Sequence, residues 1–139
     1  MIDELAKHIK NDNIKIDNSI GYAMGNFQVE FYALPNGKEP MQKLLNSVDE
    51  KMARKLLDDI DMLRVYGNSL REPYSKRVSG GIFELRVRQS TNDVRALYFF
   101  MKGRRIIITN GFVKKQNKLP LVELSRAKRY RKDWSERKA

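Results

Sequence analysis

Hydrophobic residues between positions 40 and 67 recur at steps of three and four, which predicts helices. The longer run begins after Ser47 or Asp49, either of which can cap a helix, and ends at Gly67, a residue that favours a helix C-terminus. Its apolar positions are Met52, Ala53, Leu56, Leu57, Ile60, Leu63 and Tyr66. A shorter helix is predicted from Pro40 to Ser47, with proline at its start. The short segment between the two helices predicts that they form an antiparallel pair.

Strands are predicted on both sides of this pair, because apolar and polar residues alternate there. In chain order they are Phe27–Tyr32, Ile82–Arg88, Val94–Met101 and Arg104–Thr109. We expect Leu70 to Gly81 to form a basic loop and Lys102-Gly103 to form a hairpin turn. A terminal helix begins at about Pro120. The order strand, two helices, three-stranded antiparallel meander and helix indicates an α+β fold.

The first 25 residues have a different pattern from the rest of the chain. Clusters such as Asn11-Asp12-Asn13 favour turns, while Leu5 and Ile9 could lie on one short helix. We therefore divide the 139 residues into an N-terminal arm or short helix, 1–25, and one compact domain, 26–139.

Charge is distributed unevenly along the chain. Residues 1–66 carry 9 Lys or Arg against 11 Asp or Glu, and residues 67–139 carry 19 against 6, which gives the net charge of +11. A basic half attached to a nearly neutral half is typical of surfaces that bind nucleic acid. Solvation or an anionic protein partner is the alternative.

The composition excludes several kinds of site. The chain has no cysteine and a single histidine, His8, which excludes thiol chemistry, histidine-pair ribonuclease chemistry, serine triads and histidine-rich metal sites. No apolar run approaches the roughly 20 residues that span a bilayer, and the N-terminus does not resemble a secretory signal. We expect a cytoplasmic protein with no membrane association.

Three charged residues alternate with apolar residues on the strand 82–88, so their side chains lie on one face of the sheet. They are Glu84, Arg86 and Arg88. Cleavage of RNA needs a base for the attacking 2′-hydroxyl and cations for the phosphate, and Glu84 and Arg86 could supply these. A solvated face with cross-strand ion pairs is the alternative interpretation.

Further basic residues surround these positions. Arg95 interrupts an apolar strand, where it is either paired with Glu84 or bound to a ligand, and Lys114 and Lys115 follow the last strand. We expect contacts to RNA or the ribosome from Lys76, Arg77, Arg88, Arg104, Lys118, Arg126 and Arg129. Asp58, Asp59 and Asp61 lie near Arg54 and Lys55, so helix-surface pairing explains them better than a metal site.

Several short motifs follow one another at characteristic spacings in the chain. They are Tyr66-Gly67-Asn68, Pro73-Tyr74-Ser75-Lys76, Gly81 to Arg86, Arg95 to Phe99, Asn110 to Lys115, Pro120 and Ala127 to Tyr130. In this order and spacing the chain resembles the phage-related HigB branch of the RelE/ParE toxin superfamily, over roughly residues 26–134.

This resemblance implies a toxin of a type II toxin-antitoxin pair with a fold like that of microbial ribonucleases. Such a toxin enters the ribosomal A site, cuts mRNA without a metal or other cofactor, and leaves a cyclic phosphate. The positions that match the family's basic site are Glu84, Arg86, Arg95 and Lys114 or Lys115.

The chain departs from the pattern in having Glu84 in place of a basic residue and no tyrosine between Lys115 and Pro120. Tyr98 and Tyr130 are candidates for the role of this tyrosine only if the fold brings them to the site.

The implied partners are the ribosome, mRNA and a helix-turn-helix antitoxin of the HigA type, through which operator DNA is bound. Two other functions stay open at this point. The superfamily also contains ParE-like gyrase inhibitors, and a basic domain can bind nucleic acid without cleaving it.

Overall fold

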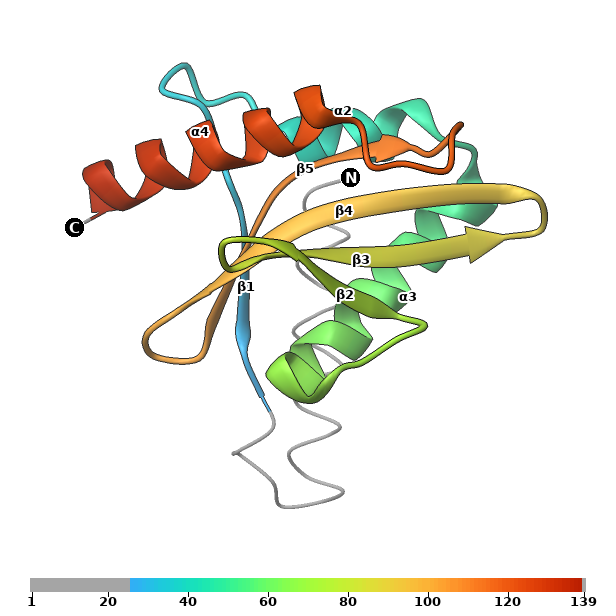
Figure 1. Ribbon diagram of the computed structural model, residues 1–139, viewed down its shortest axis with the longest axis horizontal. Coiled ribbons are helices and arrows are strands. Elements are labelled where there is room, and N and C mark those ends of the chain that lie inside the picture. The colour runs from blue at the N-terminus through green and yellow to red at the C-terminus, as the bar shows by residue number, and fades with distance from the viewer. Residues whose placement is uncertain (1–25, 139) are drawn as a thin grey trace.

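A computed structural model describes residues 26–138 as a five-stranded sheet with helices on both faces (Figure 1). The strands are β1 (Gln28–Phe31), β2 (Ser75–Ser79), β3 (Ile82–Gln89), β4 (Asn92–Met101) and β5 (Arg105–Val113). The helices are α2 (Pro40–Ser47), α3 (Glu50–Tyr66) and α4 (Leu121–Lys138), with a 3-10 turn at Gly67–Ser69. The predicted α+β class is confirmed, and the arm predicted for residues 1–25 lies outside the described residues.

The sheet has the strand order β1-β5-β4-β3-β2. Strands β2 to β5 form an antiparallel meander, and β1 adds to it in parallel with β5. The meander therefore has four strands, not the predicted three, because β2 forms within the segment that was predicted to be a basic loop. Lys76 and Arg77 are exposed on this edge strand, so its sequence lacks the apolar alternation of an inner strand.

Strand β5 is longer than predicted. It continues through Asn110-Gly111 to Val113, and its pairing with β4 shifts register between Leu97 and Tyr98, as at a β-bulge. A Cβ on Gly111 would lie 2.5 Å from Leu44 Cδ2, so glycine at this position lets α2 pack closely on the strand.

Helices α2 and α3 cover one face of the sheet, and their predicted positions are confirmed. The Asp49 side chain caps α3 by accepting a hydrogen bond of 2.8 Å from the Met52 amide, and Gly67 ends the helix at φ 52°. The two helices differ from the predicted hairpin in that α2 packs chiefly on β5 and α3 on β3, and less on each other.

The main core lies between these helices and the sheet. It contains Met41, Leu44, Leu45, Met52, Ala53, Leu56, Ile60, Leu63, Leu85, Val87, Val94, Ala96, Tyr98, Ile106 and Ile108.

Helix α4 crosses the opposite face and covers only part of it (Figure 1). One cluster joins Trp134 to Tyr32, Phe99 and Ile107, and another joins Ala127 to Ile82, Leu97 and Phe112. Trp134 Nε1 also donates a hydrogen bond of 2.6 Å to Glu30 on β1. The charged residues that β3 and β4 place on this face lie beside the covered area.

Among residues 26–138, no helix is both long and apolar enough to cross a membrane.

Candidate nucleic-acid interface

A groove of about 240 Å³ lies on the α4 side of the sheet, next to the part that α4 covers. Its lining combines cations with a small apolar floor. It consists of Lys76, Arg77, Val78, Glu84, Arg86, Arg95, Phe112, Lys114, Asn117 and Leu119. Four of the five residues predicted to act in catalysis therefore lie together, since only Lys115 is not in the lining.

Arg86 and Arg95 are opposite each other in the antiparallel register of β3 and β4. Both bind the same oxygen of Glu84: Arg86 Nε lies 3.0 Å and Arg95 Nη1 2.8 Å from Oε1. Arg95 also donates to both carboxylate oxygens of Asp93, at 2.9 and 3.1 Å. Glu84 thus holds the two guanidinium groups side by side.

The three side chains of this cluster differ in exposure. Arg95 and Glu84 are 3% and 5% exposed, whereas Arg86 is 22% exposed. Burial lowers the pKa of Arg95, but its hydrogen bonds to Asp93 and the charge of Glu84 outweigh burial and raise that pKa above its ordinary value. Arg95 is therefore permanently charged and bound to carboxylates, and Arg86 is the arginine of this cluster that remains partly exposed to the groove.

The remaining cations of the lining come from two separate segments. Lys76 and Arg77 extend from the edge strand β2, and Lys114 follows β5, where its amide donates to the Asp93 carbonyl oxygen at 2.7 Å. Glu72 lies 3.6 Å from Arg86, so carboxylates are present at the rim as well. Convergent Lys and Arg side chains around a polar groove are suited to binding phosphate.

The other residues predicted to contact RNA do not share this groove. Arg88 is 74% exposed and lies 3.6 Å from Asp93, and Arg104 occupies the β4–β5 turn beside the Phe27 ring. Lys115 and Lys118 are exposed in the loop before α4, and Arg129 is exposed on α4. Arg126 lines a different cleft and pairs with Glu123 at 3.1 Å.

Neither candidate tyrosine lines the groove. Tyr98 faces the main core, where its hydroxyl bonds to the Ser75 hydroxyl, and burial raises its pKa to about 12 despite this bond. Tyr130 stacks on Tyr32 with ring centroids 4.6 Å apart and lines the second cleft. The sequence analysis assigned no role to Asn117, which lines the groove, because a single asparagine carries no recognisable pattern.

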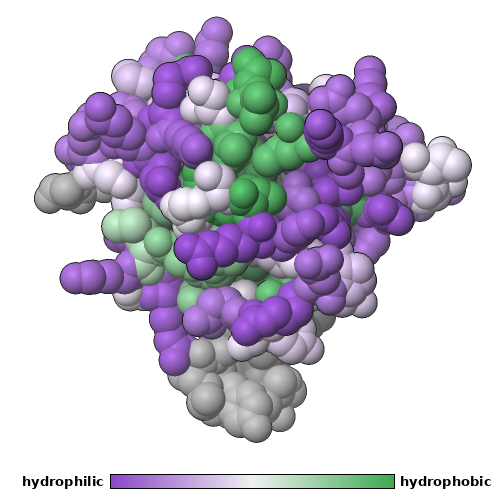
Figure 2. Space-filling view, in the orientation of Figure 1, coloured by the Kyte–Doolittle hydropathy of each residue, from purple (hydrophilic) through white to green (hydrophobic). Residues whose placement is uncertain are grey.

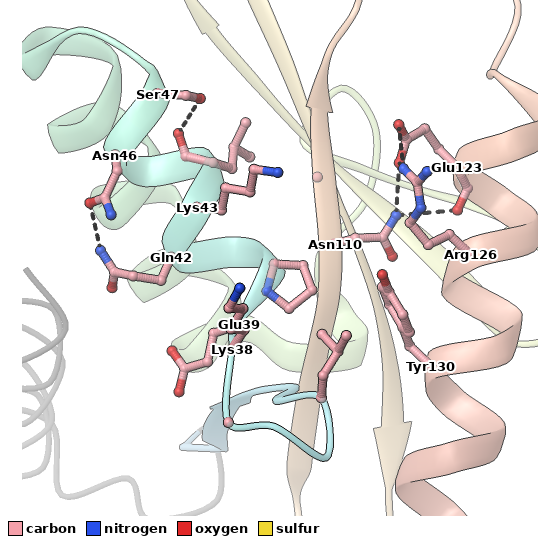
Figure 3. A pocket seen from close by; sticks show the side chains of 15 residues that line it. Lys38, Glu39, Gln42, Lys43, Asn46, Ser47, Asn110, Glu123, Arg126 and Tyr130 are labelled. Atoms are coloured by element: carbon pink, nitrogen blue, oxygen red, sulfur yellow. Dashed lines mark hydrogen bonds and ion pairs between the residues drawn. The ribbon is translucent and has the colours of Figure 1, made fainter.

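The second cleft has a volume of about 880 Å³ and lies between α2 and α4 over β5 (Figure 3). Lys43 and Ser47 come from α2, Asn110 from β5, and Glu123, Arg126 and Tyr130 from α4. The sequence analysis did not predict this cleft, because it depends on two helices that meet across one strand.

The face drawn in Figure 2 is mostly hydrophilic, with a hydrophobic area around the start of α4. Leu121 and Val122 are 80% and 60% exposed there. No group of three or more His, Asp or Glu residues within 26–138 could hold a metal ion.

The chain matches a known protein family. Residues 43–132 match the family described as "Phage derived protein Gp49-like (DUF891)", and because this match spans more than half of the chain, the protein belongs to that family. No curated protein matches it.

Among solved structures, a chain from the archaeal RelE-RelB complex of Pyrococcus horikoshii OT3 aligns with a TM-score of 0.44 and 19% identity. The alignment covers 68% of this chain and 100% of that one.

Proposed function

We propose that this protein is the toxin of a type II toxin-antitoxin pair and cleaves mRNA in the ribosomal A site. The observation that carries the proposal is the groove in which Lys76, Arg77, Arg86 and Lys114 converge beside a buried carboxylate. Membership of a phage-derived family and the sequence resemblance to the HigB branch agree with it.

In the proposed reaction the 2′-hydroxyl of one nucleotide gives up its proton to solvent water and its oxygen attacks the adjacent phosphorus. The bond from phosphorus to the 5′-oxygen breaks, and that oxygen takes a proton from solvent water. The products are a 2′,3′-cyclic phosphate and a 5′-hydroxyl. Arg86 binds the scissile phosphate, and Lys76 and Lys114 neutralise the charge that develops on it. The sequence suggested Glu84 as the base, but its Oε1 already accepts hydrogen bonds from both guanidinium groups. In this scheme Glu84 is therefore a positioning residue that holds Arg86, and Arg95 acts only through Glu84.

To test this proposal, the protein is incubated with ribosomes programmed with mRNA, at the ionic strength of cytoplasm. The 5′ ends of the mRNA are then mapped. We expect new ends within the A-site codon. Arg86→Ala should reduce the rate of cleavage by about 10²- to 10³-fold, the effect typical of removing one donor to a transition-state oxyanion. Intact message in the presence of folded wild-type protein would contradict the proposal.

Arg54→Ala is the matched control. Arg54 is an arginine on α3 that is 75% exposed and does not line the groove. The variant should cleave within about threefold of the wild type, because an exposed charge away from the groove contributes little.

One observation favours a second candidate function, inhibition of DNA gyrase. Arg95 is occupied by Glu84 and Asp93, and this buried network neutralises much of the charge that a phosphate would need. A gyrase inhibitor does not require a free cationic site. Gyrase-dependent DNA breakage together with intact ribosome-bound mRNA would select this function.

A further inference from the structure

The second cleft follows an open edge of the sheet. Strand β1 pairs with β5 only from Arg105 to Ile108, and its last contact is the Tyr32 amide, which donates to the Ile108 carbonyl oxygen at 2.9 Å. Beyond Ile108, β5 pairs with β4 alone. Within residues 26–138, the strand position beside Asn110–Val113 is therefore vacant.

The backbone at this edge is directed outward at alternate residues. The Lys114 amide donates to Asp93 on the β4 side, so Phe112 and Asn110 also bond toward β4. Gly111 and Val113 consequently direct their amide and carbonyl groups away from β4. These are the groups that an added strand would bind.

The open edge of β5 has a helix on each side. Figure 3 shows α2 on one side of β5 and α4 on the other, with the cleft between them. Leu34, Pro40 and Leu44 supply apolar surface to the cleft. Because α2 and α4 bound the cleft on both sides, it has room for one extended chain along β5 but not for a second sheet or a helix bundle.

Asn110 carries an unmet acceptor in this cleft. Its residue is only 2% exposed, and its Nδ2 donates to the Glu123 carbonyl and to Glu123 Oε1 at 3.2 and 3.1 Å. Its Oδ1 is buried with no hydrogen-bond partner. A buried amide oxygen without a donor is unfavourable, so a shift of the Asn110 side chain that brings this oxygen to a peptide N–H in the cleft would be favoured.

The charges of the cleft favour an acidic ligand. Lys38 and Lys43 are exposed in its lining, and neither has an ion pair within the described part of the chain. Of the two carboxylates, Glu123 is bound to Arg126, and burial raises the pKa of Glu39, which disfavours its charge. The positive charges of Lys38 and Lys43 are therefore little neutralised by the carboxylates of the cleft.

We propose that this cleft binds an extended acidic peptide segment of a partner protein, which adds a strand to β5 beside Gly111 and Val113. Backbone hydrogen bonds would supply affinity, and Lys38 and Lys43 would select carboxylates. Identifying the partner as the antitoxin rests on the proposed function, but the open edge, the flanking helices and the charges do not.

The test starts with a phage-displayed library of random peptides of about eight residues, panned against the full chain. We expect enriched peptides that are acidic and bind wild-type protein. Lys43→Glu should weaken their binding by about five- to tenfold through charge repulsion. Lys51→Glu, which reverses an exposed lysine on α3 outside the cleft, is the matched control and should leave binding unchanged.

Hydrogen exchange then locates the peptide. Slowed exchange of the Gly111 and Val113 amides on addition of a selected peptide supports strand addition, and N-methylation of alternate peptide nitrogens should abolish it. Failure to enrich any peptide that depends on Lys43, or protection at another place, overturns the inference.

Other occupants would give different results, and each overturns the inference. Protection by an oligouridine would assign the cleft to RNA. Protection already present in the free chain would assign it to a second copy if it depends on protein concentration, and to another segment of the same chain if it does not. The proposed function is tested separately, because mRNA cleavage can fail while peptide binding succeeds.

Discussion

The two faces of the sheet are built from the same strands but differ in what covers them. On one face α2 and α3 bury a continuous apolar layer that includes Leu56, Leu85 and Ile106. On the other face α4 buries two small clusters, and β3 and β4 carry Glu84, Arg86 and Arg95.

This difference separates stability from binding. The covered face can be apolar at every inward position because no ligand enters it. The partly covered face leaves a groove and a cleft on either side of the start of α4, where β5 contributes to both. Charged residues at the edge of the area that α4 covers must be paired with one another or remain in contact with solvent.

The largest effect is expected from breaking the buried ion cluster. Arg95→Ala leaves Glu84 and Asp93 without their shared cation, and the free energy of unfolding should fall by about 3–5 kcal/mol. Urea unfolding measures this change. The exposed Arg88→Ala should shift it by less than about 0.5 kcal/mol. Equal shifts would mean that the cluster does not support the groove face.

The next effect concerns the covered face. Leu56 is fully buried on α3, so Leu56→Ala should lower the free energy of unfolding by about 2–5 kcal/mol through lost burial and a cavity. Leu121→Ala removes a similar side chain that is 80% exposed at the start of α4 and should change it by less than about 0.5 kcal/mol. Chemical unfolding of both variants checks whether the two faces differ as described.

A smaller effect is expected where α4 is fastened to β1. Trp134→Phe removes the hydrogen bond to Glu30 and should cost about 1.5–3 kcal/mol, the range for bonds to charged groups. Tyr130→Phe, on the same helix, removes a hydroxyl at the cleft and should be nearly neutral. Thermal unfolding of the two variants compares them, and a neutral Trp134→Phe would show that apolar packing alone holds α4.

The smallest effect is a pH dependence. The hydrogen bond from Arg95 lowers the pKa of Asp93 below its ordinary value of 3.8, although burial opposes this. A folded-state pKa below the unfolded one gives stability that is complete above about pH 4 and lost as the pH falls through the folded pKa. Asp93→Asn should remove this part of the acid dependence, on the order of 1 kcal/mol or less, as measured by unfolding between pH 3 and 7.

Much of the fold could be predicted because its elements have strong local patterns. The α3 helix combines regular apolar spacing, an Asp49 cap and a terminal Gly67, and all three are present in the structure. The β4–β5 hairpin turn at Lys102-Gly103 is similar, since Gly103 adopts a positive φ of 82°. In these segments the local preference and the tertiary environment agree.

The elements that were missed depend on distant partners. Ser75–Ser79 is mostly polar and forms a strand because β3 offers it an edge, and Asn110-Gly111 continues β5 although this pair of residues usually marks a turn. In the candidate site, alternation correctly placed Glu84 and Arg86 on one face. It could not show that Arg95 is enclosed by two carboxylates while Arg86 remains partly open.

The sequence by itself determined the α+β class, most of the helix and strand positions and the basic character of the second half, because these follow from local spacing and composition. The tertiary structure alone decided which cations meet, which are neutralised, and that a cleft opens beside an unpaired edge of β5. Those features arise from side chains far apart in the chain, and their pairing and burial depend on the packing of α2 and α4 against the same strand.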